Sequence, residues 1–216
     1  MNKFVVAIDG PAGSGKSSIS EIVSKKLGFT RINTGAMYRA IAVYAVNKGI
    51  NLDDEKEYDF LDDILVVYEN GITKINGNVV PDEILKGASS AASRVSKLKR
   101  VRDKMLIFQR ASAIGNVLMD GRDIGTVVFP DADLKIYLDA SAEERANRRY
   151  KEIKGTVNEL PYDVILKEIN DRDYQDKHRE IAPLKKADDA ILIDTTSMTI
   201  DEVVNKIIDL INEKKR

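Results

Sequence analysis

The side chains that usually build metal centres and nucleophilic triads are scarce in this sequence. The 216-residue chain has no cysteine, no tryptophan and a single histidine. The absence of cysteine excludes disulfides and thiolate metal sites. With one histidine, neither a histidine-based metal cluster nor a Ser-His-Asp triad is expected.

A charge imbalance and long apolar runs are also missing. The chain has 34 basic and 35 acidic residues, a net charge of −1, which gives no overall attraction to DNA, RNA or anionic lipid. No apolar run approaches the roughly 18 residues of a membrane span, and the N-terminus enters a core-like strand with no signal peptide. We therefore expect one α/β domain in the cytoplasm, without nucleic-acid or membrane partners.

Residues 10–17 read GPAGSGKS and match the pattern G-x-x-x-x-G-K-[ST]. They follow a strand-like run and precede a segment with helical spacing, the context that a phosphate-binding loop requires. Successive backbone N–H groups and the dipole of the next helix attract an anion. We expect Lys16 to reach the transferring phosphates and the Ser17 hydroxyl to hold Mg²⁺. The predicted cofactor-binding residues are Gly10, Pro11, Ala12, Gly13, Ser14, Gly15, Lys16, Ser17 and Ser18.

Strand-like and helix-like segments alternate along most of the chain. Apolar runs predict strands at residues 4–8, 29–33, 117–119, 134–138 and 190–194. Helical spacing predicts helices at residues 36–47, 82–92, 97–113, 142–153, 162–177 and 200–211. This alternation predicts an α/β fold of the P-loop NTPase type, with a parallel sheet and helices on both faces.

Two stretches interrupt the alternation. Short apolar runs at residues 64–68, 72–75 and 78–80 are separated by Asn70-Gly71 and Asn76-Gly77, and Asn-Gly between apolar runs is a strong hairpin signal. We expect an inserted three-stranded antiparallel subdomain covering about residues 62–95. Residues 154–161 connect two charged helices, and we expect a lid over about residues 150–165.

Two classes of P-loop protein compete at this point, a GTP-dependent switch and a small kinase. A switch should carry Asn-Lys-x-Asp to read guanine, but Asn47-Lys48 and Asn205-Lys206 lack the aspartate. A nucleic-acid-dependent ATPase would want a basic groove with aromatic residues, and the composition argues against it. A small kinase remains, with residues 1–216 forming one P-loop kinase domain.

The arginines favour this interpretation. Phosphoryl transfer brings two anions together, and fixed guanidinium groups hold phosphate oxygens in pairs. Several arginines come just after predicted strands, where an open α/β sheet binds ligands. For most of them a surface position is the alternative, but Arg122 lies in Asp120-Gly121-Arg122-Asp123, directly beyond a buried strand.

The motifs resemble those of the bacterial cytidylate kinases, a family of nucleoside-monophosphate kinases, over nearly the whole chain. The resemblance is carried by residues 8–17, by Thr34-Gly35-Ala36-Met37-Tyr38-Arg39, by residues 120–132 and 139–145, and by Arg172-Asp173, Asp176, Arg179 and Ala182-Pro183-Leu184. It implies ATP-dependent phosphorylation of CMP and dCMP by in-line transfer with Mg²⁺, by a monomeric enzyme. A related kinase acting on UMP or another metabolite is the alternative.

The resemblance also implies roles for residues of the acceptor site. Arg39, Arg122 and Arg179 would clamp the CMP phosphate, Arg172 and Asp176 would contact the ribose, and Ser93, Arg102 and Asp123 would read the base. Thr34 and Tyr38, in the Arg39 motif, would also bind substrate. An ionised Asp123 would accept the exocyclic amine of cytosine and repel the carbonyl that uracil has there.

On the donor side, Arg145, Arg148 and Arg149 are candidate lid residues that close over the transferring group, with an exposed charged helix as the alternative. Asp9 and Asp120 end strands beside the loop, and either could support Mg²⁺ through water. Asn33 stands where relatives often have aspartate before Thr-Gly. We interpret His178 as an incidental neighbour of the Asp176 to Arg179 segment.

Overall fold

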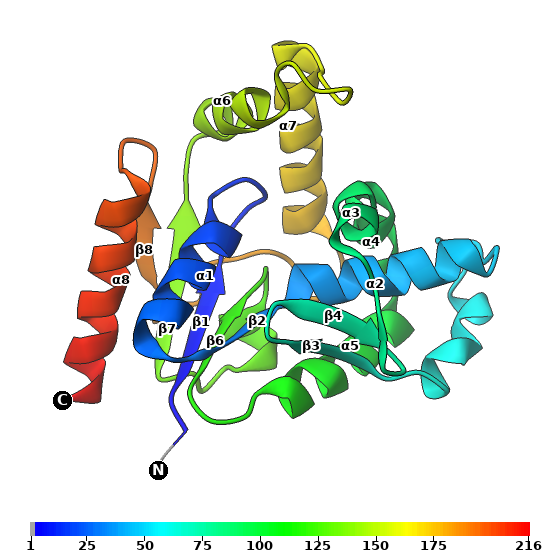
Figure 1. The fold of residues 1–216 in the computed structure, drawn as a ribbon, viewed down its shortest axis with the longest axis horizontal. Coiled ribbons are helices and arrows are strands. Elements are labelled where there is room, and N and C mark those ends of the chain that lie inside the picture. The colour runs from blue at the N-terminus through cyan, green and yellow to red at the C-terminus, as the bar shows by residue number, and fades with distance from the viewer. Residues whose placement is uncertain (1–2) are drawn as a thin grey trace.

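A five-stranded parallel sheet forms the centre of the molecule in the computed structural model, which describes residues 3–216. The strand order is β2-β6-β1-β7-β8, and every neighbouring pair is parallel (Figure 1). The strands are β1 Val5–Asp9, β2 Thr30–Asn33, β6 Val117–Asp120, β7 Leu134–Asp139 and β8 Ile191–Asp194. The predicted parallel α/β fold is confirmed.

Alternate residues of the central strand β1 pack against helices on opposite faces. Val6 and Ile8 belong to a buried cluster with α1 (Lys16–Leu27) and α8 (Ile200–Lys215). Ala7 points the other way, into a cluster with α2 (Thr34–Asn47) and α5 (Lys99–Ser112). Because β1 is buried on both faces, it is apolar at every position up to Asp9.

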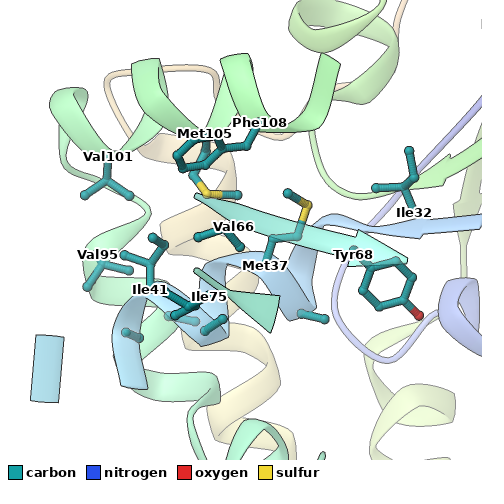
Figure 2. Packing of buried hydrophobic residues seen from close by; sticks show 14 of the residues in the cluster. Ile32, Met37, Ile41, Val66, Tyr68, Ile75, Val95, Val101, Met105 and Phe108 are labelled. Atoms are coloured by element: carbon teal, nitrogen blue, oxygen red, sulfur yellow. The ribbon is translucent and has the colours of Figure 1, made fainter. Parts of the chain in front are cut away.

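A separate three-stranded antiparallel sheet lies beside α2. Its strands are β3 Val66–Glu69, β4 Ile72–Ile75 and β5 Asn78–Val79, in the order β3-β4-β5. Asn70 and Asn76 have φ of 51° and 49°, and each is followed by a glycine with positive φ, as two-residue hairpin turns require. Figure 2 shows Val66, Tyr68 and Ile75 packed close to Met37 and Ile41 of α2 and Met105 of α5.

Short helices flank this sheet. The 3₁₀ helix η1 (Glu55–Asp62) precedes it, and α3 (Asp82–Gly87) and α4 (Ser89–Val95) follow it. The single helix predicted over residues 82–92 is wrong, because the backbone breaks at Ala88, where φ is −90° and ψ is 14°. The last helix extends to Lys215, beyond the predicted end at residue 211.

The remaining helices lie at the carboxyl ends of the strands. Helix α6 (Ala142–Ile153) follows β7 and packs on α7 (Tyr162–His178), and both stand above the loop between β1 and α1 (Figure 1). A short π-helix, η2 (Ile124–Val128), follows β6 and was not predicted. Between residues 3 and 216, no helix has both the length and the apolar character needed to cross a membrane.

Candidate active site

The loop between β1 and α1 adopts a conformation that depends on glycine. Gly10 has φ of 150°, and a Cβ atom there would come within 2.0 Å of the carbonyl oxygen of Leu138. Gly15 has φ of 84° and stands directly before the first residue of α1. An L side chain is therefore excluded at Gly10 by backbone atoms and is strained at Gly15.

Lys16 is buried within this loop. Its Nζ atom donates hydrogen bonds to the carbonyl oxygen of Pro11 at 2.6 Å and to Oγ of Ser14 at 3.2 Å. Burial, and next the neighbouring Arg122 guanidinium, hold the pKa of Lys16 well below its usual value. A phosphate in the loop would reverse this effect, since an anion stabilises the ammonium form.

The structure distinguishes the two aspartates that could support Mg²⁺. Asp120 ends β6, and its Oδ2 accepts a hydrogen bond from the Ser17 hydroxyl at 3.3 Å. Both carboxylate oxygens of Asp9 instead accept backbone N–H groups, at 2.8 Å from Ile124 and 2.7 Å from Gly125. Hard oxygen donors suit Mg²⁺, so Ser17 and Asp120 form the set that fits the ion.

Asn33 lies beside the same set. Its Nδ2 is 3.5 Å from Oγ of Ser17, and its Oδ1 accepts from the Ala36 amide at 3.0 Å. Asn33 therefore caps the N-terminus of α2 with its oxygen and presents its amide nitrogen to Ser17.

A cleft of about 630 Å³ extends from the phosphate loop to the end of α7. Most of the predicted site residues line it. These are Ala12, Gly13, Gly15, Lys16, Ser17, Ser18, Thr34, Tyr38, Arg39, Ser93, Arg122, Arg145, Arg148, Arg149, Arg172, Asp176 and Arg179. Gly10, Pro11 and Ser14 belong to the same loop but are buried and do not line the cleft.

Four arginines line this cleft, and three of them, Arg122, Arg172 and Arg179, act on Asp176, whereas the fourth, Arg39, lies near Arg122 and Arg172. Nε of Arg122 donates to Oδ2 of Asp176 at 2.9 Å. Burial acts to raise the pKa of Asp176, but the surrounding guanidinium groups outweigh burial and lower the pKa.

The four arginines outnumber the Asp176 carboxylate, and two of them have N–H groups without a hydrogen-bond acceptor among the described residues. Within residues 3–216, the buried Nε atoms of Arg39 and Arg172 have no hydrogen-bond partner. Burial and then the neighbouring Arg122 lower the pKa of Arg172 to about 10. Unpaired buried N–H groups are costly, and an anion bound here would satisfy them.

Two of the three predicted base readers, Arg102 and Asp123, are buried. The guanidinium of Arg102, on α5, forms a buried ion pair with Asp123, and Arg179 approaches the other Asp123 oxygen at 3.5 Å. The Arg102 guanidinium also lies 5.9 Å from the centre of the Tyr38 ring. Ser93 lines the cleft, whereas Arg102 and Asp123 are buried behind it.

The three predicted lid arginines differ in their surroundings. Arg145 is buried, and its guanidinium donates to the carbonyl oxygens of Ala140 and Ala12 and to both carboxylate oxygens of Asp173. Arg148 binds Glu144 and the carbonyl oxygen of Thr195. The side chain of Arg149 is 57% exposed and pairs with Glu152.

Sequence reasoning assigned no part in the site to Asp173 or Thr195. Asp173 fixes Arg145 from α7, and Thr195, after β8, fixes Arg148 and lines the cleft. Asp173 belongs to the Arg172-Asp173 motif, but the motif does not reveal its role, because the residue that it fixes lies 28 positions away; the partner of Thr195 lies 47 positions away. His178 stacks on Tyr174 at 4.1 Å between ring centres and does not line the cleft.

Comparison with known proteins connects this cleft to an enzyme family. A family model described as Cytidylate kinase matches residues 6–213. The chain belongs to the cytidylate kinase family. It is therefore a kinase with a nucleotide-binding phosphate loop and small-molecule substrates.

Curated relatives match along the whole length. The chain is 48% identical to a cytidylate kinase of Acholeplasma laidlawii over 217 residues, covering 100% of this chain and 98% of that protein. It is 49% identical to a cytidylate kinase of Thermosipho africanus, covering 97% of this chain and 95% of the relative. A shikimate kinase structure from Bacteroides thetaiotaomicron, 9% identical, has a TM-score of 0.50 and covers 97% of this chain and 98% of its own; this likeness shows the fold alone.

Proposed function

We propose that the enzyme phosphorylates CMP and dCMP, with ATP as donor and Mg²⁺ as the metal. The observation that carries the proposal is one cleft that joins the phosphate loop to a cluster of four arginines. A phosphoryl donor and a phosphorylated acceptor are both anions, and a single-site ATPase would need only the loop. The curated relatives are named cytidylate kinases, which supports CMP as the acceptor.

Catalysis in this proposal is positioning plus charge stabilisation, without a covalent enzyme intermediate. Residues Gly10 to Ser18 hold the donor phosphates through backbone N–H groups, and the Lys16 ammonium group stays in contact with the phosphoryl group during its transfer. Arg122 lies close enough to Lys16 to lower the pKa of that lysine. The two cations would meet the donor and the acceptor phosphate where these approach each other.

Mg²⁺ would be held at Ser17, with Asp120 as a partner, directly or through water. When bound, the ion neutralises developing charge on the donor phosphates. The 3.3 Å contact between these two side chains is made by oxygens alone, and Mg²⁺ commonly binds one or two carboxylates together with substrate phosphates.

Different residues of the acceptor site would bind the phosphate, the ribose and the base of CMP. Arg39, Arg122 and Arg179 bind the CMP phosphate, Arg172 and Asp176 contact the ribose, and Ser93, Arg102 and Asp123 read cytosine, with Thr34 and Tyr38 nearby. The Arg102–Asp123 pair is already buried. Uracil would place a carbonyl oxygen against the Asp123 carboxylate, and the repulsion between the two acceptors would make the site reject uracil.

Two regions would complete the site. The segment of about 62–95, with β3, β4 and β5, would carry part of the CMP site, and the region of about 150–165 would act as a lid. Arg145, Arg148 and Arg149 would then close over the phosphates, since closure keeps the phosphoryl group from water. We also propose a monomeric enzyme of the cytoplasm; light scattering tests the first point.

One coupled assay tests this function. ATP and Mg²⁺ are supplied with CMP, dCMP, UMP, AMP and GMP in parallel, and ADP formation is followed. CMP and dCMP should give the highest kcat/KM. A faster reaction with UMP or AMP would contradict the roles of Arg102 and Asp123, and no acceptor-dependent ADP would refute the kinase activity on nucleoside monophosphates altogether.

A further inference from the structure

Asp9 joins two parts of the active site that are far apart in the sequence. It is the last residue of β1, it stands directly before Gly10, and it is 5% exposed. Its Oδ1 accepts the Ile124 amide at 2.8 Å and its Oδ2 accepts the Gly125 amide at 2.7 Å. These hydrogen bonds span more than a hundred positions.

Both amides belong to the turn that carries the proposed acceptor contacts. Arg122 and Asp123 immediately precede Ile124, and the π-helix η2 begins there. Upstream, the Gly121 amide donates to the carbonyl oxygen of Ile8 at 3.0 Å. The turn is therefore attached to the end of β1 on both sides of Arg122 and Asp123.

Asp9 has little freedom to move. Gly10 packs against the backbone of Leu138, where a Cβ would come within 2.0 Å of the carbonyl oxygen. On the other side, a Cβ on Gly125 would lie 3.4 Å from Oδ2 of Asp9 and 3.1 Å from Cδ of Lys135. A substitution that changes the Asp9 carboxylate should consequently shift the turn at Ile124 and Gly125, because the phosphate loop has no room to move.

From this geometry we propose that Asp9 is a positioning residue that sets the distance between the phosphate loop and the turn holding Arg122 and Asp123. It does not contact substrate; it acts through Ile124 and Gly125. The inference rests on the proposed function, because its consequence is the fit of CMP. A carboxylate is required, since the Ile124 and Gly125 amides donate to different oxygens of Asp9, and a side-chain amide has only one acceptor oxygen.

Asp9→Asn is the decisive variant. Its amide group can accept one N–H and must turn an NH₂ towards the other. Hydrogen exchange at the Ile124 and Gly125 amides, followed by NMR on the nucleotide-free enzyme, should speed up about ten- to hundredfold, the range expected for a lost hydrogen bond to a charged group. Asp194→Asn is the control at the end of another strand: Asp194 ends β8, but it is exposed, and its Oδ1 alone accepts the amide and the hydroxyl of Thr196.

Kinetics separate positioning from a merely structural role. For Asp9→Asn, the KM for CMP should rise about tenfold, kcat should fall because the displaced turn also carries Arg122, and the preference for CMP over UMP should fall, while the KM for ATP stays within about threefold. Asp9→Glu keeps both acceptors but displaces the turn, so exchange should remain slow while the preference for CMP still falls. This second variant decides the matter if Asp9→Asn does not fold.

The outcomes are distinguishable. Unchanged exchange and unchanged CMP preference in both variants would overturn the inference and leave the proposed function intact. An equal loss for ATP and CMP would also overturn it, because it would indicate general damage. A wild-type enzyme without CMP phosphorylation would refute the proposed function instead, and that result is independent of either variant.

Discussion

The donor and acceptor halves of the cleft are built in different ways. The donor half is one continuous segment, residues 10–18, whose shape comes from backbone conformation and whose Lys16 hydrogen bonds stay within the loop. The acceptor half gathers side chains from α2, from the turn after β6 and from α7, and it depends on the balance between Asp176 and its arginines. Removing one side chain from the donor half should leave its backbone shape intact. Removing one charged side chain from the acceptor half should also disturb the charged side chains that it pairs with.

Removing the central charge of the donor half should have the largest effect. Lys16→Ala should lower turnover by about a thousandfold, the scale for one electrostatic group at a transferring phosphoryl. The fold should remain intact, because burial already disfavours this charge. Steady-state kinetics with ATP and CMP and a thermal melt measure both effects.

Lys25→Ala is the control, since Lys25 lies on the same helix but is exposed and pairs with Glu21. Near-normal turnover in Lys16→Ala would refute the proposed role of Lys16 and remove the donor half from the comparison.

Removing a charge from the acceptor half should act on one substrate. Arg179→Ala should raise the KM for CMP about a hundredfold, because the loss of one partner from a buried charge group costs about 2–5 kcal/mol. The KM for ATP should change little. Lys167→Ala, an exposed lysine of α7 paired with Asp171, is the control. A change confined to ATP would require withdrawing Arg179 from the phosphate clamp.

A change within the acceptor half should alter selectivity more than rate. Asp123→Asn removes the negative charge that would repel uracil and keeps the side-chain shape. The ratio of kcat/KM for CMP to that for UMP should fall about tenfold or more, measured by competition between the two acceptors. An unaltered ratio would show that the base is read elsewhere.

The smallest effect should appear in how the free energy of unfolding depends on pH, and it should come from Asp9, which connects the two halves. Burial, the largest cause, raises the pKa of Asp9 to about 6, so the folded enzyme holds this proton more tightly than the unfolded chain. The stability that this group contributes is present below about pH 4 and is lost as pH rises through about 6. Relative to Asp9→Asn, wild-type stability should fall over that window, by at most about 1.4 kcal/mol per pH unit.

Denaturant unfolding of both proteins at several pH values measures this difference, and other titrating groups cancel in the comparison. A wild-type stability that rises with pH relative to Asp9→Asn over the same window would contradict the raised pKa of Asp9.

Much of the fold could be predicted because its signals are local. The apolar run of β1, the hairpin glycines after Asn70 and Asn76, and the Ala142–Ile153 helix follow from neighbouring residues. The break at Ala88 and the π-helix at Ile124–Val128 were missed. The π-helix depends on a distant contact, because its Ile124 and Gly125 amides donate hydrogen bonds to Asp9, more than a hundred positions earlier.

The sequence by itself determined the phosphate loop, since glycines and a lysine at fixed spacing dictate a backbone shape wherever the loop is placed. It also supplied the arginines and aspartates of the acceptor site. Only the tertiary structure decided their partners: Asp120 rather than Asp9 beside Ser17, Asp173 on Arg145, and Arg102 on Asp123. The reason is physical. A backbone turn is set by the residues within it, but an ion pair exists only where folding brings distant side chains within a few ångströms.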